Sequence, residues 1–424
     1  CSTRGFSQLQ LHELSGLVLL WSLFSFAAQD FRIVAIRSTG SHEFTEQEIA
    51  DASGLKINQT VGPAEFKNAA DRLASTGAFA QVGYKYGPLG AGMFVEFQVE
   101  DAPEFLPVRF ENLVWFSDSE LTAELSRRVP LYHGHLPPGG GMVDSTVSAI
   151  QSLLAEKGIP ATAAMRMHSP APGKPIDAVS FYVEGPPLLV KKVDVAGANL
   201  VPLSDVNDAL KSIVGMNYDS GVIDESIRYR LDPLYQTHGL LHFKLDPPQV
   251  SISGDPRNPD VLLSMKIDEG PQYKFGEFHW TGNTVVTEKD LNKTMEKCST
   301  GAVANLPLLI QAAKFANGLY FSRGYLQSKV QLIPTYDDDK KIVDYELHIV
   351  EGQQYHMGHI QVVGLEAEQC RKLENAWKIK QGEPYDPSYE NQFIREHLAS
   401  LRGRPARTTI TQNKDATVDV RVEF

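Results

Sequence analysis

Two pairs of histidines have a spacing that could bind a metal ion. His133-Gly134-His135 and His356-x-x-His359 each bring two imidazoles close together along the chain. A structural zinc site normally has four protein ligands, and neither pair has a nearby cysteine or a cluster of carboxylates. His238 and His242 are also close, but Gly239 interrupts the helix between them. We therefore interpret these histidines as solvated or hydrogen-bonded side chains, and we predict neither a metal nor another cofactor.

Other segments that resemble phosphate-binding or catalytic motifs lack the spacing that the chemistry requires. Residues 87–92 (GPLGAG) lie in a predicted hairpin turn, and residues 139–141 (GGG) are not followed by Lys-Ser or Lys-Thr, so neither forms a nucleotide-binding loop. Residues 337–339 (DDD) fit a hairpin turn, because a calcium loop has spaced ligands and a downstream glutamate. The sequence contains no G-x-S-x-G elbow and no H-E-x-x-H helix. It predicts no catalytic residues and a chain that is not an enzyme.

Charge and cysteine content narrow the class of protein further. The 424 residues carry a formal net charge of -12, and binding to nucleic acid would need concentrated Lys and Arg, so we expect no nucleic-acid partner. Three cysteines (Cys1, Cys298 and Cys370) are too few for a disulfide scaffold. Cys298 and Cys370 fall in different repeats of the chain, and we interpret them as buried free thiols, with a bridge between them as the alternative.

An apolar segment near the N-terminus indicates export. Residues 14–28 (LSGLVLLWSLFSFAA) carry no charge and are shorter than the roughly 20 residues of a membrane span, which fits the core of a signal peptide. The small residues Ser25 and Ala27 suit cleavage after Ala27. Retention of the segment as an N-terminal anchor is the alternative. We assign residues 1–29 to a signal peptide or anchor, and no later apolar stretch approaches the length of a span.

A glycine that ends an amphipathic helix and precedes an alternating strand recurs along the chain. The five glycines, which are 79–85 residues apart, are Gly77, Gly158, Gly239, Gly324 and Gly403. Glycine is favoured where a helix ends in the left-handed conformation, which explains its recurrence at this place. The regular spacing predicts five tandem repeats.

The helix before each of these glycines carries an apolar stripe with helical period, which we expect to face the core. The predicted core positions are Phe66, Ala69 and Leu73; Val147, Ile150 and Leu154; Ile227, Leu231 and Leu234; Leu308, Ala312, Phe315 and Leu319; and Ile394, Leu398 and Leu401.

Each repeat opens with one strand and closes with two. The opening strands end near Gly40, Asn112, Gly197, Gly282 and Gly364. The closing strands alternate apolar and polar residues, which indicates one buried and one solvated face. The pattern predicts an α+β fold of five βααββ domains, each a three-stranded sheet with two helices on one face. The predicted domains span residues 30–101, 102–186, 187–270, 271–352 and 353–424.

The order strand, helix, helix, glycine, strand, strand resembles the POTRA (polypeptide-transport-associated) domain, in five tandem copies over residues 31–424. Five is also the number in the periplasmic arm of BamA-type outer-membrane assembly factors, which this chain resembles. Those proteins continue into a membrane β-barrel. Residues 417–424 (TVDVRVEF) alternate and end on Phe424, and they fit the closing strand of the fifth repeat better than a barrel strand. We expect either a free POTRA protein or one truncated before a barrel.

The resemblance implies that the chain works through its surface. In a POTRA sheet the strand after the recurring glycine lies at an edge, where an extended client can pair with its free backbone groups. We predict that the edge of repeat three binds clients or partners. The predicted residues are His242, Phe243, Lys244, Leu245, Gln249, Val250, Ser251 and Ile252. Pro247 and Pro248 remove two backbone N–H donors and so interrupt this binding edge. Alternatively, these prolines are there to protect the edge against aggregation.

The implied function is that of a periplasmic scaffold for assembly of outer-membrane β-barrel proteins or for protein translocation, exported and associated with the outer membrane. The implied partners are unfolded outer-membrane proteins, a barrel partner or a missing C-terminal barrel, and other subunits of the assembly machinery. The alternative is an envelope or cell-division scaffold of the FtsQ type, anchored in the inner membrane by residues 14–28. Net charges of -4, -3, -4, -1 and 0 along the five repeats favour the fifth repeat as the one nearest an anionic envelope surface.

Overall fold

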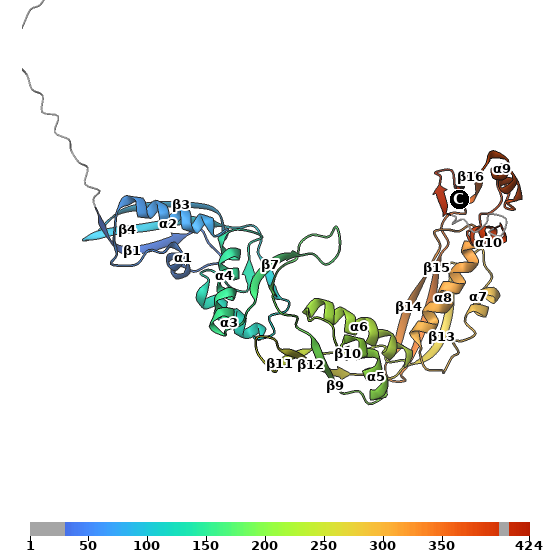
Figure 1. Cartoon of the computed structure of the whole chain (residues 1–424), viewed down its shortest axis with the longest axis horizontal. Coiled ribbons are helices and arrows are strands. Elements are labelled where there is room, and N and C mark those ends of the chain that lie inside the picture. The colour runs from blue at the N-terminus through green and yellow to red at the C-terminus, as the bar shows by residue number, and fades with distance from the viewer. Residues whose placement is uncertain (1–29, 398–406) are drawn as a thin grey trace, which may run out of the picture. The chain divides into compact units, whose positions relative to one another are not determined.

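The computed structural model describes residues 30–397 and 407–424, which form five small sheets with helices packed beside them (Figure 1). These residues group into two compact units. The first holds residues 30–110 and 116–184, and the second holds residues 111–115 and 185–424. The predicted α+β class is confirmed. The apolar N-terminal segment, Leu398, Leu401 and Gly403 lie outside the described residues.

The first unit contains repeats one and two. The elements of repeat one are β1 (Phe31–Thr39), α1 (Glu46–Ser53), β2 (Thr60–Val61), α2 (Pro63–Ser75), β3 (Phe79–Leu89) and β4 (Gly92–Asp101). The elements of repeat two are β5 (Leu106–Phe110), α3 (Asp118–Arg128), β6 (His135–Leu136), α4 (Gly141–Glu156), β7 (Thr162–His168) and β8 (Ala178–Glu184).

The second unit contains repeats three to five. The elements of repeat three are β9 (Val190–Ala196), α5 (Leu203–Leu210), η1 (Lys211–Ile213), α6 (Ser220–Thr237), β10 (Lys244–Leu245), β11 (Gln249–Ser253) and β12 (Asp260–Asp268). Repeat four has β13 (Lys274–Thr281), α7 (Glu288–Thr294), α8 (Leu306–Phe321), β14 (Lys329–Asp337) and β15 (Ile342–Val350). Repeat five has β16 (His356–Val363), α9 (Ala367–Ala376), α10 (Ser388–His397), β17 (Arg407–Gln412) and β18 (Thr417–Glu423).

The last strand of each repeat lies at the centre of its sheet. In repeat four, β15 pairs in parallel with the opening strand β13 and antiparallel with β14, from Lys329 opposite Val350 to Asp337 opposite Ile342. The other four sheets pair in the same sense around β4, β8, β12 and β18. The strand after the recurring glycine is therefore an edge strand in every repeat.

A short segment between the two helices pairs with the beginning of each opening strand, which the sequence pattern does not reveal. It forms β2 beside β1 and β6 beside β5, and it is reduced to a single bridge in the other three repeats. Two residues are too few to show an alternating pattern. In repeats one and two the predicted three-stranded sheet thus gains a short fourth strand on the side opposite the edge strand, whereas the sheets of repeats four and five have the three predicted strands. In repeat three the edge itself is divided into β10 and β11.

Side-chain caps explain where five of the ten described α-helices begin. Thr45 and Glu48 form a capping box on α1, in which the Thr45 hydroxyl accepts from the Glu48 amide and the Glu48 carboxylate accepts from the Thr45 amide. Ser117, Asp219 and Thr287 cap α3, α6 and α7, and Asn305 caps α8 in the same way. Among the helices of the described residues, none combines the length and apolar character needed to cross a bilayer.

The predicted apolar stripes are buried or half-buried where the structure describes them, with one exception in repeat four. Phe315 is 60% exposed, so its predicted place in the core is wrong. The buried positions of α8 are Leu309, Ala312, Ala313, Ala316 and Tyr320. This stripe begins one residue later than predicted, because the small alanines let the helix pack closely on the sheet while Leu309 and Tyr320 fill the core at its ends.

Candidate functional site

The predicted client-binding segment of repeat three contains a true sheet edge, β11. This strand pairs with β12 alone, from Gln249 opposite Ser264 to Ser253 opposite Asp260. Val250 and Ile252 are half-buried against the repeat, whereas Gln249 and Ser251 are exposed. The backbone groups on the free side of β11 thus lack a neighbouring strand within the described part of the chain.

Pro247 and Pro248 interrupt this edge as a bulge. Before them, Leu245 lies opposite Ile267, and the Asp246 amide donates to the carbonyl of Lys266 over 3.0 Å. After them, Gln249 lies opposite Ser264, so the edge strand has gained one residue relative to β12. A bulge is a place where a strand accommodates prolines, since an unpaired residue needs no donor.

His242 and Phe243 lie before the edge rather than in it. The ring of His242 is 4.3 Å from that of Tyr336 and 5.2 Å from that of Tyr273, both in repeat four. Phe243 stacks on Tyr235 of α6 at 4.6 Å. Of the predicted segment from His242 to Leu245, only Lys244 and Leu245 are in a strand, because packing against neighbouring aromatic rings holds the two earlier side chains.

A glycine ends the opening strand in four repeats because the backbone of the central strand passes beside it. Gly40, Gly197, Gly282 and Gly364 have φ between 75° and 98°. A Cβ atom on any of them would lie 2.1–2.3 Å from a carbonyl oxygen of the central strand or, in repeat five, of Phe424 directly after it. Both the positive φ and the close approach exclude an ordinary side chain.

A carboxylate at the end of the central strand holds the turn that follows this glycine. In repeat three, Glu269 accepts hydrogen bonds from the amides of Asn199, Leu200 and Val201 over 2.7–3.0 Å. Asp101 in repeat one and Glu351 in repeat four accept from the corresponding turns. Each carboxylate therefore connects the last strand of a repeat to the segment before its first helix.

Repeats three, four and five are joined by two equivalent sets of contacts. The Tyr273 amide donates to the carbonyl of Gly239, and the Tyr355 amide donates to that of Gly324, both over 2.8 Å. A Cβ atom on Gly239 or Gly324 would lie 2.6 or 2.4 Å from the carbonyl oxygen of that same tyrosine. The glycine that follows the second helix of one repeat thus packs directly against the residue before the first strand of the next.

A glutamine completes each of these two joints. The Gln272 amide group donates to the carbonyl of His238, and that of Gln354 donates to the carbonyl of Arg323, both over 2.9 Å. Sequence reasoning missed these residues, although Gly-Pro-Gln-Tyr (270–273) and Gly-Gln-Gln-Tyr (352–355) recur at the two boundaries. This recurring motif is the feature of the sequence that could have identified the two glutamines.

In the first unit, Gly77 and Gly158 also follow the second helix of their repeats, but their surroundings differ. A Cβ atom on Gly77 would lie 2.3 Å from the carbonyl oxygen of Gly139, so Gly77 packs against the glycine-rich segment before α4. This contact explains the residues 139–141 that resemble a phosphate loop. Gly158 has no atom within 4 Å of a Cβ position.

Histidines and cysteines were the remaining candidates for a metal site or a disulfide. His133 contacts the Glu48 carboxylate at 2.6 Å, and His359 lies 3.2 Å from Asp419. Within residues 30–397 and 407–424, no three side chains of His, Cys, Asp or Glu gather as metal ligands would. Cys298 is buried and Cys370 is half-buried, and both thiols are free, so the alternative of a bridge between them is wrong.

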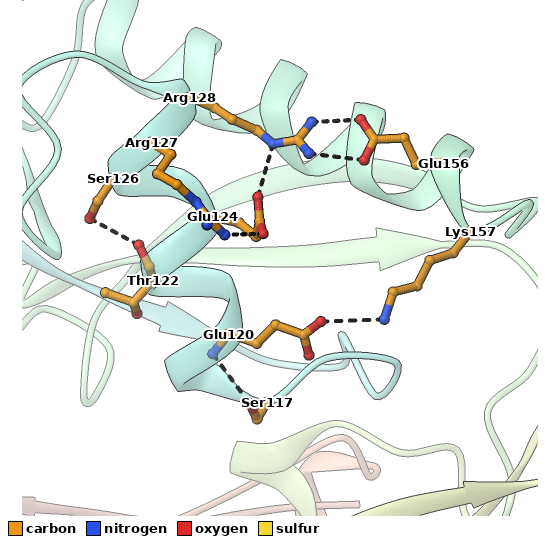
Figure 2. A network of polar contacts seen from close by, with 9 residues as sticks. All are labelled: Ser117, Glu120, Thr122, Glu124, Ser126, Arg127, Arg128, Glu156 and Lys157. Atoms are coloured by element: carbon orange, nitrogen blue, oxygen red, sulfur yellow. Dashed lines mark hydrogen bonds and ion pairs between the residues drawn. The ribbon is translucent and has the colours of Figure 1, made fainter.

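Figure 2 shows a polar network that joins α3 and α4 in repeat two. Arg128 binds both oxygens of Glu156 over 2.7 and 2.9 Å and also reaches Glu124 over 3.3 Å. Lys157 and Glu120 form a further, longer pair between the two helices. These side chains are partly solvated and paired with each other, so the network links the two helices.

Comparison with known proteins identifies the family of one repeat. Residues 273–352 match the family model POTRA, described as "Surface antigen variable number repeat". A protein of Treponema pallidum (strain Nichols), "Putative outer membrane protein assembly factor", is 23% identical over 142 residues, which are 34% of this chain and 17% of that protein.

Two solved structures are also similar. One is POTRA3-5 of BamA from Haemophilus influenzae. The match covers 56% of this chain and 95% of the Haemophilus chain, with a TM-score of 0.45 and 16% identity. The other is POTRA1-3 of Omp85 from Anabaena. The match covers 57% of this chain and 96% of the Anabaena chain, with a TM-score of 0.27 and 15% identity. The predicted resemblance to POTRA proteins of outer-membrane assembly is confirmed by the family match and the Treponema relative.

Proposed function

Residues 273–352 form a POTRA repeat, and on this premise we propose that the chain is a periplasmic scaffold for assembly of outer-membrane β-barrel proteins or for protein translocation. It binds unfolded clients by adding them as strands to its sheet edges. It is exported, associates with the outer membrane and performs no catalysis. Its partners are a β-barrel protein, on the same or another chain, and other subunits of the assembly machinery. The observation that carries this proposal is the free edge of β11.

An edge strand suits clients of many sequences. Its free N–H and C=O groups recognise the backbone of an extended segment, which every unfolded barrel strand presents. Ordering a disordered segment costs much of the binding free energy, so each contact is weak and exchanges readily. The side chains of Gln249 and Ser251 are exposed, so this face of the edge can accommodate the side chains of a client. The proline bulge shortens the edge, so two copies of the chain pair poorly with each other.

The alternative function, an envelope or cell-division scaffold anchored by residues 14–28, predicts that these residues remain in the mature protein. N-terminal sequencing of the protein from its own cells separates the two functions. Cleavage after Ala27 supports the assembly scaffold, and retention of residues 14–28 supports the anchored one.

Two proline variants, Val250→Pro and Ser251→Pro, test whether clients bind by adding a strand to β11. Adjacent amides of a strand point to opposite sides, so one variant removes a bond to β12 and the other removes a donor on the free side. Thermal unfolding identifies the variant that keeps the fold. We expect that variant to bind a labelled peptide, taken from one strand of an outer-membrane barrel protein, about tenfold more weakly than the unmodified chain.

Ser251→Ala is the matched control, because it changes the side chain and keeps the amide. It should bind the peptide as the unmodified chain does. Equal binding by the well-folded proline variant would show that β11 is not the client edge.

A further inference from the structure

The two helices of repeat four leave a groove between them on the solvent side. It has a volume of about 510 Å³ and is lined by Phe315, Leu319 and Arg323 of the α8 region and by five residues of α7 and the segment after it. Those five residues are Asp290, Lys293, Thr294, Glu296 and Lys297. The groove is separate from every sheet edge, since α7 and α8 form its walls.

Phe315 makes this groove an apolar surface. It is 60% exposed, although α8 has a complete buried stripe on its other side. Leu319, one turn further on, packs partly against the cluster of Val286, Leu291 and Tyr320, so it forms a firm floor beside the phenyl ring. A large aromatic ring that is exposed next to a fixed apolar floor is a typical anchor for a partner.

Basic side chains predominate around this apolar floor. Three of the five ionisable residues that line the groove are basic, in a chain whose net charge is -12. Lys293 pairs with Asp290 over 2.8 Å, and Arg323 donates to the carbonyl of Leu319 over 2.6 Å. Lys297 and Glu296 are both exposed and make no ion pair within the described residues, so the three basic and two acidic lining side chains leave a net charge of +1. The groove therefore favours an occupant that carries carboxylates beside its apolar side chains.

We propose that this groove binds an acidic amphipathic helix of a partner protein. Five of the eight lining residues lie in α7 and α8, and a helix bonds its interior backbone groups internally, so the groove lacks a strand edge and binding must come from side chains. A helix presents apolar residues at positions i and i+4 on one face, and two such side chains fit the floor made by Phe315 and Leu319. The partner's acidic residues then lie beside Lys293 and Lys297. This interaction goes beyond strand addition and does not depend on β11.

The experiment uses the full chain and three synthetic peptides of about 18 residues, or five helical turns. The first has Leu at i, i+4 and i+7 with Glu and Ala elsewhere, the second has Lys in place of Glu, and the third has prolines that keep it extended. Fluorescence anisotropy measures their affinities. We expect the acidic helix to bind at least about tenfold more tightly than the basic one and the extended one.

Phe315→Ala should weaken binding of the acidic helix by about tenfold without changing the thermal midpoint, because the ring lies outside the core. Ile310→Ala, at an exposed position of the same helix that does not line the groove, is the matched control and should bind as the unmodified chain does. Lys293→Glu with Lys297→Glu should reverse the preference between the acidic and basic peptides.

Several outcomes would overturn the proposal. They are failure of the acidic helix to bind, equal binding of the extended peptide, or no effect of Phe315→Ala. Sedimentation that shows a dimer of this chain, lost on Phe315→Ala, would assign the groove to a second copy instead. The proline variants of β11 should retain binding of the acidic helix, so failure of strand addition and failure of this groove are distinguishable.

Discussion

At the residue scale, repeats one, three and four each have a glycine and a carboxylate that act on the same turn. The glycine lets the end of the opening strand pass within van der Waals reach of the central strand, and the carboxylate binds the amides that follow. Several amides directed at one carboxylate make charge-assisted hydrogen bonds, which are stronger than neutral ones.

Gly282→Ala tests the close approach at this turn. Its Cβ would lie 2.2 Å from the carbonyl oxygen of Ile349, so β13 must move away from β15. Gly301 in the same repeat has a similar φ but open space around it, and Gly301→Ala should cost only the conformational strain of about 1–2 kcal/mol. We expect a larger loss for Gly282→Ala, measured by denaturant unfolding. Equal losses would mean that the positive φ alone requires glycine.

Glu351 should make repeat four sensitive to acid. Burial raises the pKa of Glu351, but hydrogen bonds from Thr284 and Val285 lower it by more, so its pKa lies below the usual value of 4.5. The folded carboxyl therefore binds fewer protons than the unfolded one, and its stabilisation is present above the unfolded pKa and lost as the pH falls through the folded pKa.

Glu351→Gln removes this pH dependence because an amide does not titrate, and it weakens the turn because a neutral amide oxygen accepts more weakly than a carboxylate. We expect reduced protection of residues 283–287 at pH 7 in hydrogen exchange corrected for intrinsic rates, and a flatter pH profile below about pH 4.5 than for the unmodified chain. An unchanged profile would show that the carboxylate does not stabilise the turn.

At the element scale, periodicity predicted the helices and strands but not how α8 is rotated. The stripe of α8 was predicted one position too early, because its sequence is apolar on several sides and the choice among them depends on the sheet that it covers. That rotation exposes Phe315 and creates the groove beside α7. Sequence alone placed β11 correctly as an alternating segment, whereas its place at the edge follows from its pairing with β12.

Links between neighbouring helices also belong to this scale. The pair of Arg128 with Glu156 connects α3 to α4, and Arg128 also pairs with Glu124 on its own helix (Figure 2). Water screens these partly exposed pairs, and such pairs contribute little to folding. Burial of the apolar stripes, such as Leu121 and Leu125 on α3 and Ile150 and Leu154 on α4, is the larger contribution.

At the scale of the whole molecule, the joints decide how repeats act together. Gly324→Ala would place a Cβ 2.4 Å from the carbonyl oxygen of Tyr355 and so loosen the contact between repeats four and five. We expect a broader distance distribution between spin labels at positions 314 and 372 in a chain whose half-buried Cys370 is replaced by serine. Gly158→Ala, with open space around it, should leave that distribution unchanged. Identical distributions for all three chains would show that the glycine contact does not hold the joint.

The sequence by itself determined the repeats, their helices and strands, and the glycines between them. These features follow from local preferences, namely side-chain period, capping and the tolerance of glycine for positive φ. Only the tertiary structure decided which backbone each glycine meets, which carboxylate holds each turn, and which side of α8 faces solvent. Those choices join residues that are about 30–70 positions apart in the chain, such as Gly282 and Ile349, and local preference carries no information about such pairs.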